Sequence, residues 1–261
     1  VLTERLRHLI ADRGWEPATI LAVAYNVKAR DEMVERTEGL GARVRTLNGL
    51  AHGILTEHRG GPPPVLDERE VRRLLDGLLP PRRRQANTDP IAPYVEALTE
   101  VRLGLRPPRA VEDTRGDVPG LADLVGPYRA VLAERGAVDF DEQVCAAVEA
   151  LLTDPDLRRH VQGRHRHLLV DELQDLTPTH VLLVRLVAGP QLDVFGVGDD
   201  DQTIYGHAGA DPRFLIDFAR WFPGGGEHAL EVNHRSAAAI VTAAATLLSY
   251  NHRRVAKEIR P

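Results

Sequence analysis

The chain has 261 residues, of which 43% are hydrophobic, and a formal net charge of −5. It is long enough to bury a sizeable core in one large or two modest domains. No apolar stretch approaches the roughly 18 to 20 residues that cross a bilayer, and no charged-then-apolar leader opens the sequence, so we expect a soluble, cytoplasmic protein without membrane contact. The acidic balance excludes a globally basic nucleic-acid-binding protein, so any such groove would be locally basic.

Two strand-like runs mark the first part of the chain, after an apolar helical face within residues 2–10. "TILAVAY" (19–25) is a short apolar run typical of a buried strand, and "ARVRTL" (42–47) is the second. Between them, Asn26 is a suitable cap for a helix that we expect to run to about Leu40, near two glycines that end it.

The middle of the chain has a different composition. From about His58 to Pro127, proline- and glycine-rich stretches such as "GGPPP" break the sequence into short helical pieces without strand alternation, which predicts a helical insertion. Its densest basic run comprises Arg69, Arg72, Arg73 and Arg82 to Arg84. Two interpretations are open: a solvated helix face balanced by the acids of "DERE", or a surface that contacts phosphate groups.

Strand-like runs return in the last part of the chain, at "RHLLVDE" (166–172), "QLDVFGVGDD" (191–200) and "HALEV" (228–232). Thr177 as cap, Pro178 at the first helical position and a closing glycine predict a helix over "THVLLVRLVA". The single Cys145 lies in a helix-like apolar pattern, which favours a buried, inert thiol. Apolar strands alternating with helices predict an α/β fold, a parallel sheet covered on both faces.

Acidic residues follow two of these strands. Asp171 and Glu172 end "LLVDE", and ligands bind at the carboxyl ends of parallel strands, where one acid can hold a hard cation such as Mg²⁺ and the other position a water. A solvated strand end is the alternative. "FGVGDDDQTIYGHAGA" (195–210) carries three further acids, whose repulsion calls for a nearby cation or phosphate-binding machinery; a Ca²⁺-like loop or a solvated turn are its alternatives.

Six segments together resemble a known family in their order and spacing. They are "ILAVAYNVKARDEM", "RTLNGLAHGIL", "AVDFDEQV", "LLVDELQD", "GVGDDDQTIYGHAGA" and "LEVNHRS". This set is similar to the UvrD/Rep-type superfamily 1 DNA helicases. The resemblance implies a RecA-like parallel sheet flanked by helices and interrupted by a helical insertion. It divides the chain into 1–57 and 128–226 as two parts of one motor domain, 58–127 as the insertion, and 227–261 as the start of a second motor domain.

The resemblance implies ATP and Mg²⁺ as ligands and assigns the residues around them. Asp171 would hold Mg²⁺ through its water shell, and Glu172 would be the general base that orients the attacking water. Gln202 would contact the γ-phosphate, and Arg235 would act as an arginine finger on the developing charge. A surface ion pair with Glu231 is the alternative role for this arginine.

The resemblance also implies single-stranded and duplex DNA as partners. Tyr25 stands where the family has an aromatic that stacks on a base, Thr46 and Asn48 stand in the segment that touches the DNA backbone, and Tyr205 lies near the same groove. His207 stands where the family often has tryptophan, so stacking there depends on a histidine. For both tyrosines, a packing role in the core is the alternative.

One family motif is missing from the printed sequence. No G-x-x-x-x-G-K-[ST] phosphate loop occurs, although the first helix resembles the one that follows this loop, so we expect a fragment that is inactive alone. The predicted function is the amino-terminal motor portion of a UvrD-like ATP-dependent helicase, with 3′ to 5′ polarity, in DNA repair or recombination. The alternatives are a motor-dead relative that binds DNA or acts as a scaffold, and a generic nucleotide- or Ca²⁺-binding module.

Overall fold

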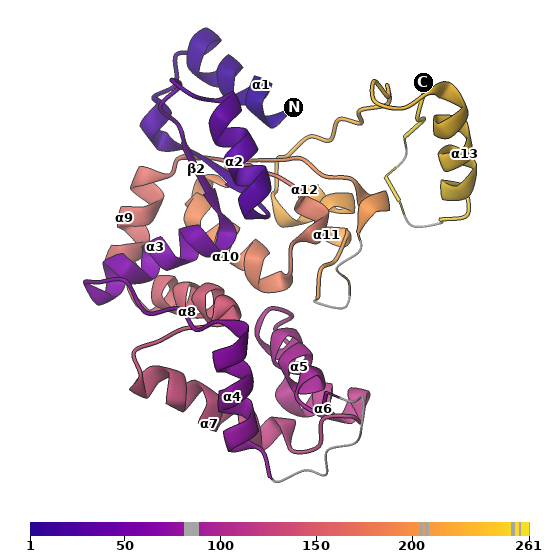
Figure 1. Cartoon of the computed structure of the whole chain (residues 1–261). Helices are drawn as coiled ribbons and strands as arrows, with labels where there is room; N and C mark the ends of the chain where they lie inside the picture. Colours follow the sequence, from indigo (N-terminus) through magenta and orange to yellow (C-terminus); the bar gives the residue numbers. More distant parts are fainter. Residues whose placement is uncertain (81–88, 204–205, 207–208, 252–253, 256, 261) are drawn as a thin grey trace.

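The computed structural model describes residues 1–80, 89–203, 206, 209–251, 254–255 and 257–260 (Figure 1). Its centre is a four-stranded parallel sheet in the order β2-β1-β3-β4. The strands are β1 (Ile20–Ala24), β2 (Arg43–Thr46), β3 (His167–Val170) and β4 (Val194–Gly196). The predicted α/β fold with a parallel sheet flanked by helices is confirmed.

Both faces of the sheet are covered by helices. The strand β1 is apolar at every position, so its side chains pack on both sides of the sheet. Leu21 and Val23 face one apolar cluster, whereas Ile20, Ala22 and Ala24 face another. Among the helices that pack in the first cluster are α3 (Leu47–Arg59), α8 (Phe140–Thr153), α9 (Pro155–Arg164) and α10 (Pro178–Ala188). The second cluster contains residues of α1 (Leu2–Arg7) and α2 (Val27–Arg36). A strand buried on both faces reads as a continuous apolar run, as the sequence indicated.

The helical middle has an apolar core of its own, which extends from Leu66 to Ala137. Its helices are α4 (Glu68–Leu78), α5 (Ala92–Arg102), α6 (Pro108–Arg115) and α7 (Leu121–Glu134), grouped at one end of the molecule with α8 between them and the sheet (Figure 1). Pro127, the expected end of the insertion, lies inside α7. The buried face of α7, which includes Leu124 and Tyr128 on either side of this proline, keeps the helix continuous although proline removes one backbone hydrogen bond.

Helix boundaries follow local capping where the sequence supplies it. The Asn26 side chain accepts a hydrogen bond from the Ala29 N–H, and Thr177 and Pro178 begin α10 as predicted. The expected end of α2 at about Leu40 is wrong, because the helix ends at Arg36. The Thr37 hydroxyl then donates to the Met33 carbonyl at 2.7 Å and the chain turns.

The expected fifth strand at "HALEV" is also wrong. Among the described residues of this segment, only Val232 pairs, in an isolated parallel bridge with Arg260. Leu230 and Val232 are exposed, so in the described structure these apolar side chains cover no core. The remaining helices are α11 (Arg213–Ile216), α12 (Phe218–Trp221) and α13 (Ala238–Leu248), the last of which stands apart from the sheet (Figure 1).

No helix in the described ranges is both long and apolar enough to cross a bilayer.

Candidate active site at the carboxyl edge of the sheet

The strand β3 delivers two acids to the carboxyl edge of the sheet. The Asp171 N–H donates to the Val23 carbonyl at 2.9 Å, so Asp171 still follows the β1 ladder. Glu172 then adopts a left-handed conformation, with φ of 51°. Non-glycine residues seldom adopt positive φ, and such residues concentrate at functional sites. Both acids remain partly exposed at this edge.

A buried amide connects this edge to the end of β4. Gln174, 1% exposed, donates through Nε2 to Glu172 Oε2 at 2.8 Å and accepts through Oε1 from the Asp199 N–H at 3.0 Å. A Cβ added at Gly198 would lie 2.5 Å from Gln174 Oε1, so only glycine allows this close approach. The Glu172 carboxylate is thus positioned by a side chain that also holds the loop after β4.

The charge environment near Glu172 opposes further negative charge. Burial, and then the Glu172 carboxylate, raise the pKa of Asp171, whereas a hydrogen bond from the Glu172 backbone N–H lowers it in part. Burial and Glu172 also raise the pKa of Asp175 to about 6. Asp175 Oδ1 is buried and has no hydrogen-bond partner in the described part of the chain. A cation at this edge would therefore relieve electrostatic repulsion.

The three acids after β4 are neutralised from within the chain. Lys257 Nζ lies 2.6 Å from Asp199 Oδ1, 2.8 Å from Asp200 Oδ1 and 3.1 Å from Asp201 Oδ2. Arg254 adds an ion pair with Asp201 at 2.7 Å. The ammonium of Lys257 thus occupies the position that the sequence pattern left open for a cation, and Arg254, Val255 and Lys257 lie against this loop.

Gln202 and Arg235, the two other residues predicted to act on phosphate, differ in where they lie: Gln202 is held on the loop after β4, whereas Arg235 lies in a separate turn. Gln202 is exposed and donates through Nε2 to Asp199 Oδ2 at 2.7 Å, which keeps it on the loop that Gln174 holds. Arg235 is exposed in a turn where Asn233 Oδ1 accepts from its N–H at 2.9 Å. In the described part of the structure, no hydrogen bond or ion pair joins the Arg235 side chain to Glu172. Its alternative partner, Glu231, pairs instead with Arg260 at 2.7 Å.

The residues predicted to contact DNA lie along the neighbouring strand ends. Tyr25 follows β1 and is partly buried. The Thr46 hydroxyl caps α3 by accepting from the Gly49 N–H at 3.0 Å, and Asn48 Nδ2 donates to the Phe140 carbonyl at 2.6 Å. Phe140 is 60% exposed beside them. Tyr205 and His207 lie outside the described residues.

The basic run of the insertion is only partly described. Arg72 pairs with Glu68 at 2.9 Å and with Asp89, and Arg73 Nε donates to the Arg69 carbonyl at 3.4 Å. These contacts favour a paired helix face at Arg72. Arg82 to Arg84 lie outside the described residues, so DNA contact by the run stays a prediction.

Sequence reasoning missed three residues of this region. The sequence shows Gln174 only as part of "DELQD". Its hydrogen bond with Asp199 could not be predicted, because it depends on the register of β3 and β4. Phe140 was detectable as a large aromatic directly after a capping acid and outside the buried face of its helix. Nothing in the sequence connected Lys257 with acids more than fifty positions earlier, because ion pairs carry no periodicity.

A parallel sheet with two acids at the end of an inner strand, joined to an acidic loop at the end of its neighbour, defines an α/β domain of the RecA-like class. The comparison with protein families is specific: residues 1–223 match the UvrD/REP helicase N-terminal domain. The chain therefore belongs to this family.

Individual relatives match over nearly the whole chain. It is 32% identical to DNA helicase II of Salmonella typhimurium and 31% identical to DNA helicase II of Escherichia coli, each over 280 residues that cover 99% of this chain and 38% of the relative. It is 28% identical over 275 residues to the ATP-dependent DNA helicase PcrA of Leuconostoc citreum, covering 99% of this chain and 36% of that protein. The chain spans less than half the length of these relatives.

Proposed function

We propose that the chain is the motor portion of an ATP-dependent DNA helicase that couples ATP hydrolysis to translocation on single-stranded DNA and to duplex unwinding. The observation that carries this proposal is the Glu172–Gln174–Asp199 connection, which joins a candidate catalytic acid to the loop that bears Gln202. Membership of the UvrD/REP family supports it, as do the names of the relatives. By the same relationship we propose 3′ to 5′ polarity and a role in DNA repair or recombination.

In this proposal Glu172 is the general base. Its left-handed backbone turns the residue out of the strand, and Gln174 orients its carboxylate toward a water that attacks the γ-phosphate. Gln202 contacts that phosphate from the adjoining loop. Arg235 is proposed as the arginine finger, which requires the turn that bears it to approach Glu172 when nucleotide binds.

Asp171 is the residue proposed to hold Mg²⁺. Its pKa is raised by burial and by Glu172, which is the setting in which a carboxylate gains most from a bound cation. A hard divalent ion is held by one or two carboxylates together with substrate phosphates. When bound, Mg²⁺ supplies positive charge to the phosphate oxygens. The acids at 199–201 fit this role less well, because Lys257 already neutralises them.

For DNA, we propose a groove along the ends of β1 and β2. The half-buried Tyr25 and the exposed ring of Phe140 offer stacking faces, and Thr46 and Asn48 offer polar contacts between them. Tyr205 and His207 remain proposed members of this groove. Stacking with few polar contacts suits binding without sequence preference. For the domains we propose the division named above, with the insertion extended to Ala137 because its apolar core continues to that residue.

The test is Glu172→Gln in the full-length gene product. We expect nearly unchanged ATP affinity, because the amide keeps the shape of the side chain, and a loss of at least about a hundredfold in turnover, the usual scale for removing a general base. Glu38→Gln, at an exposed position away from the sheet edge, is the matched control. Wild-type turnover in Glu172→Gln would show that Glu172 is not the base.

A further inference from the structure

The end of α5 in the insertion is joined to the beginning of α10, the helix that follows the Asp171–Glu172 loop. The Thr179 N–H donates to the Leu103 carbonyl at 3.1 Å, and its hydroxyl lies 2.7 Å from the Arg102 carbonyl and 3.0 Å from that of Leu103. Thr179 is 1% exposed. Carbonyls at a helix end and N–H groups at a helix start lack partners within their own helices. Here carbonyls at the end of α5 accept hydrogen bonds from Thr179 at the start of α10.

The loop that follows Gln202 reaches the same point. A Cβ added at Gly209 would lie 3.5 Å from Gly104 Cα, so the backbone after β4 touches the backbone just beyond α5. The Asp211 N–H then donates to the Leu176 carbonyl at 3.3 Å. The end of α5 therefore contacts both segments that leave the candidate nucleotide edge, one after β3 and one after β4.

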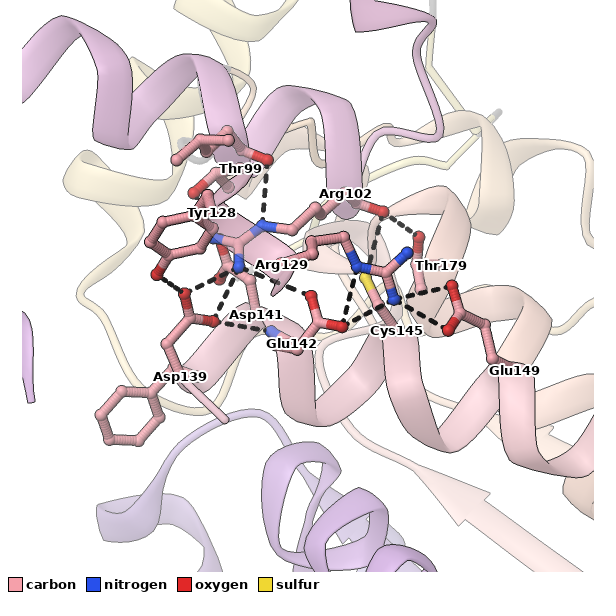
Figure 2. A network of polar contacts seen from close by, with 12 residues as sticks. Thr99, Arg102, Tyr128, Arg129, Asp139, Asp141, Glu142, Cys145, Glu149 and Thr179 are labelled. Atoms are coloured by element: carbon pink, nitrogen blue, oxygen red, sulfur yellow. Dashed lines mark hydrogen bonds and ion pairs between the residues drawn. The ribbon is translucent and has the colours of Figure 1, made fainter. Parts of the chain in front are cut away.

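Arg102 anchors this end of α5 to α8 (Figure 2). Its guanidinium, 7% exposed, donates to both carboxylate oxygens of Asp139 at 2.7 and 2.8 Å and to Asp141 at 3.0 Å. Asp139 caps α8 and also accepts from the Tyr128 hydroxyl of α7. Burial opposes the charge on Arg102, but Asp141 and Asp139 outweigh it and raise its pKa. This buried cluster ties α5 and α7 of the insertion to α8.

We infer that Thr179 is a positioning residue that couples the helical insertion to the nucleotide edge, with Arg102 as its anchor on the insertion side. A displacement of the loops after β3 or β4 shifts the end of α5, and the buried cluster passes that shift to α7 and α8. The insertion thereby responds to the state of the nucleotide, and DNA bound beside Phe140 of α8 alters hydrolysis in return, since coupling is reciprocal. This inference rests on the proposed function.

The experiment compares Thr179→Val with Thr179→Ser in the full-length gene product. Valine keeps the shape but removes the hydroxyl donor, whereas serine keeps the donor. The measurement is ATP turnover with and without single-stranded DNA, together with thermal unfolding. We expect Thr179→Val to keep basal turnover within about twofold and to lower the ratio of stimulated to basal turnover roughly fivefold, the effect of about one hydrogen bond. Thr179→Ser should restore the ratio.

The ratio separates coupling from a purely structural role. If Thr179 only stabilises the fold, both rates fall together and the ratio is unchanged in Thr179→Val, which overturns the inference. If this variant does not fold, Thr179→Ala gives the same comparison, and an unchanged ratio there is equally decisive. Absence of DNA-stimulated turnover in the wild type would instead contradict the proposed function, and this outcome is visible before any variant is measured.

Discussion

His180 makes the stability of the chain depend on pH in a calculable way. It lies in the first turn of α10, where its Nδ1 accepts from the Thr177 N–H at 3.3 Å and lies 3.0 Å from the Thr177 hydroxyl. Burial lowers the pKa of His180 to about 4, from an ordinary value of 6.5. A proton on Nδ1 would remove the acceptor and place a charge in the core, so the folded chain keeps this ring neutral.

Because the folded pKa is the lower one, protons bind more readily to the unfolded chain between about pH 6.5 and 4. The contribution of His180 is therefore fully present above pH 6.5 and is lost as pH falls toward 4. With these two pKa values, the loss between pH 7 and pH 5 is about 2 kcal/mol. For a chain of this size, that corresponds to roughly 4 to 8 °C in melting temperature.

The assay is urea or thermal unfolding of the chain and of His180→Gln at pH 7 and pH 5. Glutamine at this helix position can accept from the Thr177 N–H but does not titrate. The wild type should lose about 2 kcal/mol more than His180→Gln over this interval. His228→Gln, at an exposed position, should behave like the wild type. Equal losses in the wild type and in His180→Gln would refute the argument, because His180 would then titrate alike in both states.

Two further predictions concern the insertion and the DNA groove. Arg102→Met should lower the free energy of unfolding by about 3 to 5 kcal/mol, because it leaves the buried carboxylate of Asp139 and the partly buried one of Asp141 without their cation. Arg72→Met should cost less than about 1 kcal/mol, because its partners Glu68 and Asp89 are exposed. Equal effects in urea titrations would contradict this. Phe140→Ala should weaken single-strand binding by about 1 to 3 kcal/mol in the full-length gene product, measured by fluorescence anisotropy. Leu152→Ala, also an exposed apolar side chain on α8, should not weaken it.

The features that the sequence predicted correctly depend on residues that are close together in the chain. β1 is buried on both faces, and its five apolar residues carry no other pattern. The caps at Asn26 and Thr177 are local interactions between a side chain and a backbone N–H three residues on, so the residue type alone indicates them. Asp171 and Glu172 were detectable because a buried apolar run ends on them. These signals all lie within one turn or one strand.

The features that the sequence did not predict depend on contacts between residues that are far apart in the chain. α7 continues through Pro127 because the packing of its buried face outweighs the local cost of a proline. "HALEV" was read as a strand, but among the described residues it pairs only through Val232, with Arg260. Lys257 neutralises acids from a segment that lies beside them only in the folded chain. In each case the deciding partner is remote in sequence, and local propensity is only a weak prior.

Asp139, Asp199 and Asp171 differ in how their negative charge is balanced. At Asp139 burial opposes ionisation, but Arg102 outweighs it and the pKa is lowered. At Asp199 burial also opposes ionisation, but Lys257 outweighs it and the pKa is again lowered. At Asp171 burial and the charge of Glu172 act together, and the pKa is raised. At Asp139 and Asp199 a basic side chain of the protein outweighs burial, whereas at Asp171 burial and a second acid oppose the charge, which favours an incoming cation. On this ground the end of β3 is the better candidate for the catalytic centre than the acid-rich loop after β4.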